Sequence, residues 1–178
     1  CLGAYNIVRA IQELSYPVDT VIGISTDKAC KPVNVMGMTK AIQERIFIAA
    51  NVLNPGTRFI CVRYGNVVGS RGSVVPVFLK QRTNGKVTIT DERMTRFWIT
   101  LDQGVEFVLK NFARMQGGEI FVPKIPSLHI KDLAEALAPG VATKVIGIRP
   151  GEKLHEVMCP EEDSHLTIEF PDHYVIQP

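Results

Sequence analysis

The sequence lacks several features that would define a specialised class of protein. No apolar run approaches the roughly 18–20 residues that a transmembrane helix needs. Lys and Arg total 20 and Asp and Glu total 18, so there is no broad basic field to attract nucleic acid. The four cysteines show neither CxxC spacing nor a His partner at zinc-binding distance. These absences argue against a membrane span, a nucleic-acid partner, a disulfide scaffold and a structural zinc site, and they favour the reduced thiols of a cytoplasmic protein.

The sequence also has no conventional start. It begins with Cys1 rather than Met, and a helical apolar pattern follows at once without a residue suited to an N-cap. The sequence also lacks the basic start and the long apolar core of a signal peptide. We therefore expect the chain to begin inside a larger domain, with a processed N-terminus as the alternative. The inner face of this first helix is predicted to comprise Ala4, Ile7, Val8, Ile11 and Leu14.

What the sequence does contain is a globular pattern of alternating elements. Hydrophobic residues make up 46% of the 178 residues, enough apolar surface to offset the entropy of folding. Short β-branched runs alternate with helical patterns across short connections, which predicts parallel strands in an α/β sheet. We expect strands at residues 20–25, 58–63, 87–90, 120–123 and 145–148, and helices at 36–51, 74–83, 101–115 and 130–138. Inward positions are expected at Ile42, Ile46 and Ala49 of the second helix and at Val105, Val108, Leu109 and Phe112 of the 101–115 helix.

Chemistry-bearing residues follow the first expected strand, in the run Ser25-Thr26-Asp27-Lys28. Ligands of open α/β sheets bind at this carboxyl edge. Lys40 lies twelve residues beyond Lys28 inside the next helix, and Met36 shares its helix face four residues earlier. A thioether cannot exchange a proton, so Met36 is not an acid or a base. The alternative to a catalytic role is an Asp–Lys pair that only caps the end of the strand.

Nearly the whole chain resembles a family of sugar-nucleotide enzymes. The resemblance is carried by five blocks in order, at residues 24–29, 62–73, 93–100, 117–124 and 148–156. They are similar to the inverting UDP-N-acetylglucosamine 4,6-dehydratases, the polysaccharide-biosynthesis branch of the extended short-chain dehydrogenase/reductase family. The resemblance implies an α/β fold: a Rossmann-like parallel sheet with helices on both faces, plus a small α/β substrate-binding domain. Residues 1–70 would be the C-terminal half of the NAD(P)-binding domain and 71–178 mainly the substrate-binding region, with about 101–124 returning to the Rossmann domain.

The resemblance also implies a reaction. It is the dehydration of UDP-N-acetylglucosamine to a UDP 4-keto-6-deoxy-hexose with inversion at C5, in surface-glycan, flagellin-sugar or capsule biosynthesis. Hydride passes to and from a bound nicotinamide, NADP with NAD as the alternative. Lys28 is implied as the base at C5, and Asp27 as the acid for the departing hydroxyl. A lysine base must be neutral, a form that burial and the nearby cation Lys40 favour.

Individual site residues are carried over from the family blocks. Lys28 favours the inverting branch, because retaining dehydratases have Glu there and 4-epimerases lack the acid–base pair. The family's Tyr is replaced by Met36, which leaves Thr26, Lys28 or a water held by Lys40 for the proton of the 4-hydroxyl. The implied cofactor-binding residues are Ser25, Met36, Lys40, Val67, Val68, Gly69, Ser70 and Arg71. The implied substrate-binding residues are Asn66, Arg96, Arg149 and Glu152, and no metal is assigned.

Two other functions stay open at this stage. A nucleotide-sugar epimerase or oxidoreductase of the same superfamily would share most of these residues, and Met36 motivates a non-catalytic cofactor-binding subunit. The family's glycine-rich loop does not occur in the sequence. We therefore expect the chain alone to be inactive and prone to aggregation, and the full-length protein to be a homo-oligomer with a cytoplasmic catalytic domain, with or without a membrane anchor.

Overall fold

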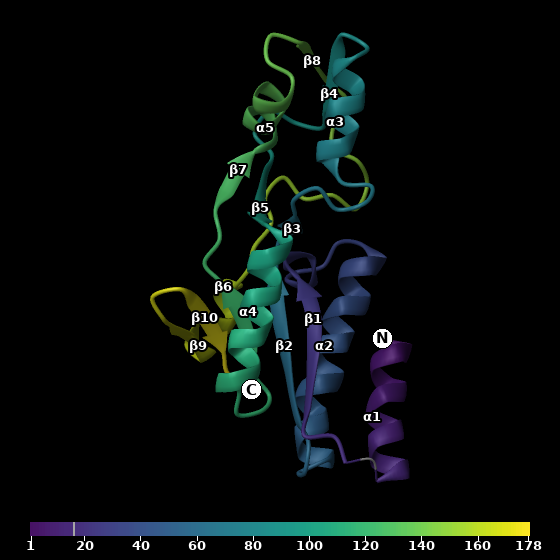
Figure 1. Ribbon diagram of the computed structural model, residues 1–178, viewed down its shortest axis with the longest axis vertical. Helices are drawn as coiled ribbons and strands as arrows, with labels where there is room; N and C mark the ends of the chain where they lie inside the picture. The colour runs from purple at the N-terminus through teal and green to yellow at the C-terminus, as the bar shows by residue number, and fades with distance from the viewer. Residues whose placement is uncertain (16) are drawn as a thin grey trace. The chain divides into compact units, whose positions relative to one another are not determined.

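The computed structural model describes residues 1–15 and 17–178, which form two compact units (Figure 1). Unit 1 comprises Cys1–Tyr64, Asp102–Lys124 and Val157–Pro178, and unit 2 comprises Gly65–Leu101 and Ile125–Glu156. This division differs from our expected boundaries in two places. The first break follows residue 64 rather than residue 70, and the last segment belongs to unit 1 because it adds two strands to the sheet of that unit.

Unit 1 is built around a five-stranded sheet of order β1-β2-β6-β10-β9. Strands β1 and β2 pair in parallel from Thr20↔Arg58 to Thr26↔Tyr64, and β6 pairs in parallel with β2, so the parallel α/β sheet predicted from the sequence is confirmed. Strand β10 runs antiparallel to both β6 and β9. The elements of this unit are α1 (Leu2–Leu14), β1 (Thr20–Thr26), η1 (Asp27–Ala29), α2 (Val35–Leu53), β2 (Arg58–Tyr64), α4 (Leu101–Arg114), β6 (Ile120–Pro123), η2 (Glu161–Leu166), β9 (Thr167–Glu169) and β10 (His173–Ile176).

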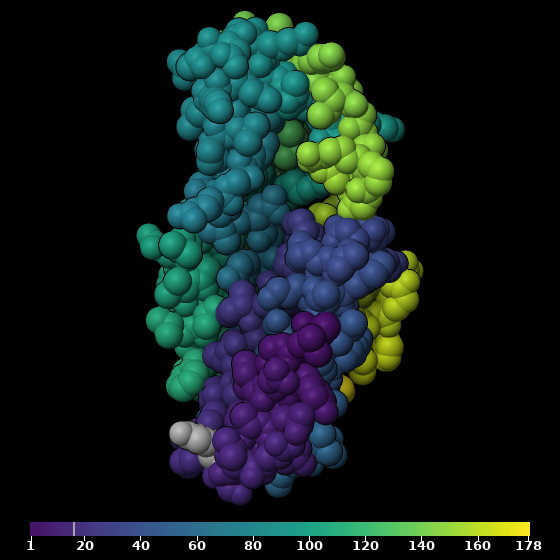
Figure 2. All heavy atoms as spheres, turned by 90° about the vertical axis from the view of Figure 1, so that its right-hand side faces the viewer, coloured from purple at the N-terminus to yellow at the C-terminus, as the bar shows by residue number. Residues whose placement is uncertain are grey.

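Helices α2 and α4 cover opposite faces of this sheet (Figure 1). Alternate side chains of β2 point to opposite faces. Phe59 faces α2, where its ring lies 5.9 Å from that of Phe47. Ile60 and Val62 belong instead to a buried cluster with Phe107 of α4. Helix α1 packs beside α2 and leaves its outer side at the molecular surface (Figure 2). Both faces of β2 are therefore covered, as a buried parallel strand requires, whereas Ile24 of β1 is exposed.

The predicted inner faces of the helices are partly wrong. In α4 the expected inward residues Val105, Leu109 and Phe112 are exposed. The stripe that packs on the sheet has a single large apolar side chain, Phe107, between Gly104 and Asn111, so apolar periodicity alone selects the wrong stripe. In α2, Ile42 and Ala49 are exposed; in α1, Ile7 and Leu14 are exposed. The residues buried instead are Gly104, Phe107 and Asn111 in α4, Gly37, Glu44, Phe47 and Ala50 in α2, and Ala4, Val8 and Ile11 in α1.

Unit 2 is a smaller α/β unit with two short sheets, β3-β5-β7 and β4-β8. Its core contains Phe78, Val87, Ile89 and Trp98. The strand expected at 145–148 lies earlier, at β8, and ends at Val145 because Gly147 adopts a left-handed φ of 89° that breaks the extended chain. The elements are β3 (Asn66–Val67), α3 (Val74–Arg82), β4 (Lys86–Ile89), β5 (Thr95–Ile99), β7 (Ser127–His129), α5 (Ile130–Leu137) and β8 (Ala142–Val145).

A search of the described residues for membrane-spanning helices finds none of sufficient length and apolarity. The same part of the chain contains no group of three His, Cys, Asp or Glu side chains placed to hold a metal ion.

Candidate active site

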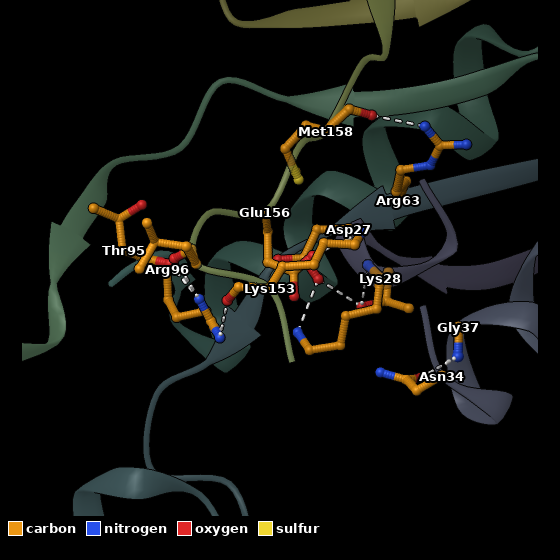
Figure 3. A network of polar contacts seen from close by, with 12 residues as sticks. Asp27, Lys28, Asn34, Gly37, Arg63, Thr95, Arg96, Lys153, Glu156 and Met158 are labelled. Carbon is orange, nitrogen blue, oxygen red and sulfur yellow. Dashed lines mark hydrogen bonds and ion pairs between the residues drawn. The ribbon is translucent and has the colours of Figure 1, made fainter. Parts of the chain in front are cut away.

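The three predicted catalytic residues at the end of β1 are joined by hydrogen bonds. Thr26 is the N-cap of η1, and its hydroxyl accepts from the main-chain N–H of Lys28 at 3.4 Å. The same hydroxyl donates to Asp27 Oδ1 at 2.9 Å. Lys28 Nζ donates to that same oxygen, also at 2.9 Å (Figure 3). The turn therefore holds an ammonium and a carboxylate in direct contact at the carboxyl edge of the parallel strands, the edge at which ligands bind in such sheets.

The second carboxylate oxygen of Asp27 is unsatisfied. Asp27 is fully buried, and its Oδ2 has no hydrogen-bond partner among residues 1–15 and 17–178. A buried acceptor without a partner is costly, and such groups in folded proteins often mark functional sites. Oδ2 is therefore the oxygen of this carboxylate that has hydrogen-bonding capacity left in the described structure.

Helix α2 places Lys40 beside the end of β1. Lys40 Nζ donates to the carbonyl of Ile24 at 2.8 Å and to Gln43 Oε1 at 3.3 Å. An ammonium has three N–H donors, and the described residues take two of those of Lys40, which leaves one that a ligand such as a ribose hydroxyl could accept. Met36 lies one turn earlier on α2 and is 47% exposed. These residues fit a nicotinamide ribose at this edge, while Met36 supplies no proton donor.

The start of α2 closely approaches the turn formed by Thr26, Asp27 and Lys28, which carries the predicted catalytic residues (the catalytic turn). Asn34 caps the helix, and its Oδ1 accepts from the main-chain N–H of Gly37 at 2.8 Å (Figure 3). A Cβ atom on Gly37 would overlap the main-chain oxygen of Lys28. Glycine is therefore required at this position by close approach of the two backbones, and it fixes how near α2 lies to η1.

A buried ion pair behind the turn was missed by the sequence analysis. Glu44 of α2 and Arg63 of β2 are each 3% exposed and 2.7 Å apart between Oε2 and Nη2. Burial alone would lower the pKa of the Arg63 guanidinium, but the hydrogen bonds and charge of Glu44 raise it. The sequence does contain a signal for this pair: Glu44 lies among apolar residues of a helix, and Arg63 lies at the end of an apolar strand. Because buried charges are usually paired, these two residues could have been predicted to form an ion pair. Ser25 joins this pair through its hydroxyl.

In unit 2, the predicted cofactor loop extends from β3. Asn66 and Val67 pair with β5, and the N–H of Val68 continues the ladder by donating to the carbonyl of Ile99 at 2.9 Å. Gly69 then adopts a φ of 71°, which turns the chain away from the sheet. Val68, Gly69, Ser70 and Arg71 are exposed. Their assignment to the cofactor stays a prediction.

Apart from Asn66 in β3, whose contact with substrate stays a prediction, the predicted substrate residues of unit 2 fall into two groups. Arg149 and Glu152 are brought together: Arg149 Nε donates to Glu152 Oε1 at 3.0 Å. Burial would raise the pKa of Glu152, but hydrogen bonds from Arg149 and its charge lower it. Arg96 is buried and donates to three main-chain carbonyls, those of Thr95 at 2.6 Å, Lys153 at 3.0 Å and Leu154 at 3.2 Å (Figure 3). Arg96 thus holds the segment that follows Glu152, and direct substrate contact by Arg96 stays a prediction.

Comparison with known proteins establishes the family. The sequence model of the protein family described as "Polysaccharide biosynthesis protein" matches residues 1–178 of the chain. The chain belongs to the polysaccharide biosynthesis protein family. This family member is 58% identical over 180 residues to the UDP-N-acetylglucosamine 4,6-dehydratase (inverting) of Campylobacter jejuni, covering 99% of the chain and 53% of that relative. The similarity to the inverting dehydratases inferred from the sequence is thereby confirmed.

Further relatives broaden the comparison. The UDP-glucose 4-epimerase of Rickettsia conorii is 43% identical over 182 residues, covering 98% of the chain and 53% of that protein. The solved structure of Pen from Bacillus thuringiensis superposes with a TM-score of 0.90 at 34% identity, covering 99% of this chain and 58% of the other. The Rossmann-like α/β fold is thus confirmed, and the chain spans about half the length of the curated relatives it matches.

Proposed function

We propose that the polypeptide containing this chain is an inverting UDP-N-acetylglucosamine 4,6-dehydratase that supplies a sugar for polysaccharide biosynthesis. The observation that carries the proposal is the Asp27–Lys28 pair at the end of β1, with Lys28 in the position that the inverting branch requires. The 58% identity to the Campylobacter jejuni dehydratase supports the same substrate and outcome. A bound nicotinamide would accept hydride from C4 of the sugar and later return it to C6.

The pair can reach its reactive form without an external proton. Lys28 Nζ lies 2.9 Å from Asp27 Oδ1, so proton transfer along this contact converts the ion pair into a neutral amine and a carboxylic acid. Exclusion of water by a bound substrate favours this neutral form, because burial disfavours charge. The neutral amine is the base that C5 needs, and the acid is the donor that the C6 oxygen needs.

The elimination then closes the proton cycle. Once C4 is a ketone, Lys28 takes the acidified C5 proton and its electron pair forms the C5–C6 double bond. The C6–O bond breaks as Asp27 gives its proton to the departing oxygen, which leaves as water. Lys28 is then an ammonium and Asp27 a carboxylate, the starting ion pair. Return of the hydride from the nicotinamide to C6, and addition of a proton from solvent to C5 on the face opposite Lys28, would give the inverted product.

The remaining roles are assigned by contact and by resemblance. The third donor of Lys40 supports its role in holding the ribose, and NADP rather than NAD is the cofactor implied by the resemblance. The proton of the 4-hydroxyl passes to Thr26, Lys28 or a water on Lys40.

Because no Gly-x-x-Gly-x-x-Gly run occurs in the 178 residues, the chain alone is proposed to be inactive. Four free cysteines support a reducing, cytoplasmic compartment, and homo-oligomerisation stays a prediction.

A second candidate is a UDP-sugar 4-epimerase, favoured by the 43% identity to the Rickettsia conorii protein. Epimerisation needs no acid at C6 and releases no water, so the Asp27–Lys28 pair would be unused. A non-catalytic subunit would bind UDP-N-acetylglucosamine without turnover. Mass spectrometry together with NMR of the sugar nucleotide recovered from the full-length polypeptide and UDP-N-acetylglucosamine separates the three, because a 4-epimer has the mass of the substrate and only NMR distinguishes it from unreacted substrate. We expect a product lighter by one water; a product of unchanged mass, or none, overturns the proposal.

A further inference from the structure

Four segments of unit 1 meet at the buried Glu44–Arg63 ion pair. Glu44 Oε1 accepts from the Ser25 hydroxyl at 2.6 Å and from Arg63 Nε at 3.0 Å. Glu44 Oε2 accepts from Arg63 Nη2 at 2.7 Å. Arg63 Nη1 donates to the carbonyl of Met158 at 2.7 Å (Figure 3). The network therefore ties together β1, α2, β2 and the segment after residue 157.

Stability alone does not account for such a pair. Removing two charges from water is costly, and replacing a buried ion pair by apolar residues of similar size is often neutral or stabilising. Here the pair is well satisfied: both carboxylate oxygens of Glu44 and three guanidinium nitrogens of Arg63 have partners. What an apolar pair could not provide is a fixed acceptor for the hydroxyl of Ser25.

The position of Ser25 connects the network with the catalytic turn. Ser25 is the residue immediately before Thr26, and its hydroxyl is anchored to α2 rather than to β2, its partner strand. Glu44 lies one helical turn after Lys40, on the same side of α2. The Ser25–Glu44 hydrogen bond therefore links the strand end that presents the acid and base to the helix that presents Lys40.

We propose that Glu44 is a positioning residue, held by Arg63, which fixes the Thr26–Lys28 turn in register with Lys40 through its bond to Ser25. This inference rests on the proposed function only in assigning chemistry to that turn. Catalytic groups must be held to within about 0.5 Å, and a misplacement of about 1 Å can cost on the order of 100-fold in rate. Loss of the link should consequently lower kcat more than it changes KM.

A cycle of variants in the full-length polypeptide tests the proposal. The first is Ser25→Ala, which removes the hydroxyl alone. The second is the apolar pair Glu44→Leu with Arg63→Met, and the third combines all three substitutions. We expect Ser25→Ala and the apolar pair each to lower kcat about 10- to 100-fold with KM within about 3-fold, and the triple variant to be no slower than the apolar pair.

A matched control separates positioning from stability. Thr57, like Ser25, donates its hydroxyl to another part of unit 1: the Thr57 hydroxyl donates to the main-chain carbonyl of Val18 at 2.6 Å. This bond lies at the opposite end of β1 and β2. Thr57→Val should lower the melting temperature and leave kcat unchanged. If the apolar pair fails to fold, the comparison of Ser25→Ala with Thr57→Val still decides the matter. A kcat for Ser25→Ala within 2-fold of the wild-type value would overturn the positioning role.

The outcome is separable from that of the proposed function. Product identity from the wild-type polypeptide tests whether the reaction is dehydration or epimerisation. Both reactions begin with hydride transfer from C4, so the reduction of the nicotinamide in a single turnover, followed by absorbance, measures the effect of Glu44 in either case. An epimerised product would contradict the dehydratase assignment and leave the positioning role standing. If the rate of nicotinamide reduction and kcat are both unchanged in Ser25→Ala and in the apolar pair, the positioning role is contradicted and the dehydratase assignment stands.

Discussion

Lys28 Nζ and Asp27 Oδ1 lie 2.9 Å apart, and this contact joins a base and an acid whose functions can be separated by mutation. Lys28→Ala should abolish exchange of the C5 proton with solvent, because no other group of the turn is an amine. Asp27→Asn should block the loss of water and should slow that exchange without abolishing it, because Lys28 keeps its amine but loses the carboxylate that accepts its proton. Each change should lower turnover by about 10²- to 10⁴-fold, the usual contribution of a general acid or base.

NMR of UDP-N-acetylglucosamine in D₂O with the full-length polypeptide measures both steps. Lys31→Ala is the matched control, since Lys31 is exposed and pairs with Glu162. It should exchange and dehydrate at the wild-type rate. Exchange of the C5 proton by Lys28→Ala at an undiminished rate would show that another group is the base.

A methyl group at residue 37 is predicted to displace the catalytic turn. In Gly37→Ala the new Cβ would overlap the main-chain oxygen of Lys28, and backbone atoms cannot move aside as a flexible side chain can. We expect turnover to fall at least 10-fold, on the same grounds of misplacement. Gly3→Ala is the control, because Gly3 is also helical and has nothing within 4 Å of an added Cβ. That change should stabilise α1 by about 0.5–1 kcal/mol. Equal activity of the two variants would contradict the prediction.

Arg96 is predicted to contribute stability to unit 2 through its three carbonyl partners. Arg96→Lys keeps the charge but cannot reproduce the planar fork of donors. Leaving a buried carbonyl without a partner costs about 1–3 kcal/mol, so urea unfolding should show a loss of that size. The neighbouring Arg93→Lys should change the unfolding free energy by less than about 0.5 kcal/mol, since Arg93 is exposed and pairs with Asp91. Similar losses for both variants would argue against this role of Arg96.

The cysteines give a pH-dependent prediction. Burial raises the pKa of Cys159 to about 11, whereas Cys1 is exposed. In the folded protein iodoacetamide should therefore label Cys1 well before Cys159 at pH 8, because the thiolate is the reactive form. Cys159 ionises more readily when unfolded, so its contribution to stability is complete below pH 9 and is lost as the pH rises towards about 11. Peptide mapping by mass spectrometry measures the order, and equal labelling at pH 8 would refute it.

Local sequence patterns predicted most of the parallel sheet. The β-branched runs before Thr26 and Tyr64 form β1 and β2, and the turn chemistry of residues 54–56 ends α2. The turn at Thr26, Asp27 and Lys28 was placed at the correct edge, because the helical crossover between β1 and β2 makes the two strands parallel, and parallel strands end at the same side.

Features that depend on tertiary fit were not predictable in this way. The exposed stripe of α4 is the more apolar one, whereas the buried stripe comprises Gly104, Phe107 and Asn111, so only the fit to the sheet surface selects Phe107 over Leu109. The Glu44–Arg63 pair joins residues 19 apart on different elements. Strand β10 lies in a tail of mixed composition, and it pairs with β6 across a sequence separation that runs from 50 residues (Pro123 to His173) to 56 residues (Ile120 to Ile176).

The configuration at C5 of the product is the measurement that tests the account most directly. The full-length polypeptide should convert UDP-N-acetylglucosamine in D₂O into a 4-keto-6-deoxy sugar that has lost one water, carries solvent deuterium at C5 and is inverted there by NMR. Lys28→Ala should form this product at least about 100-fold more slowly. A 4-epimer of unchanged mass, or a 4-keto-6-deoxy sugar with retained configuration at C5, would contradict the assignment of Asp27 and Lys28 as the acid and base of an inverting dehydratase.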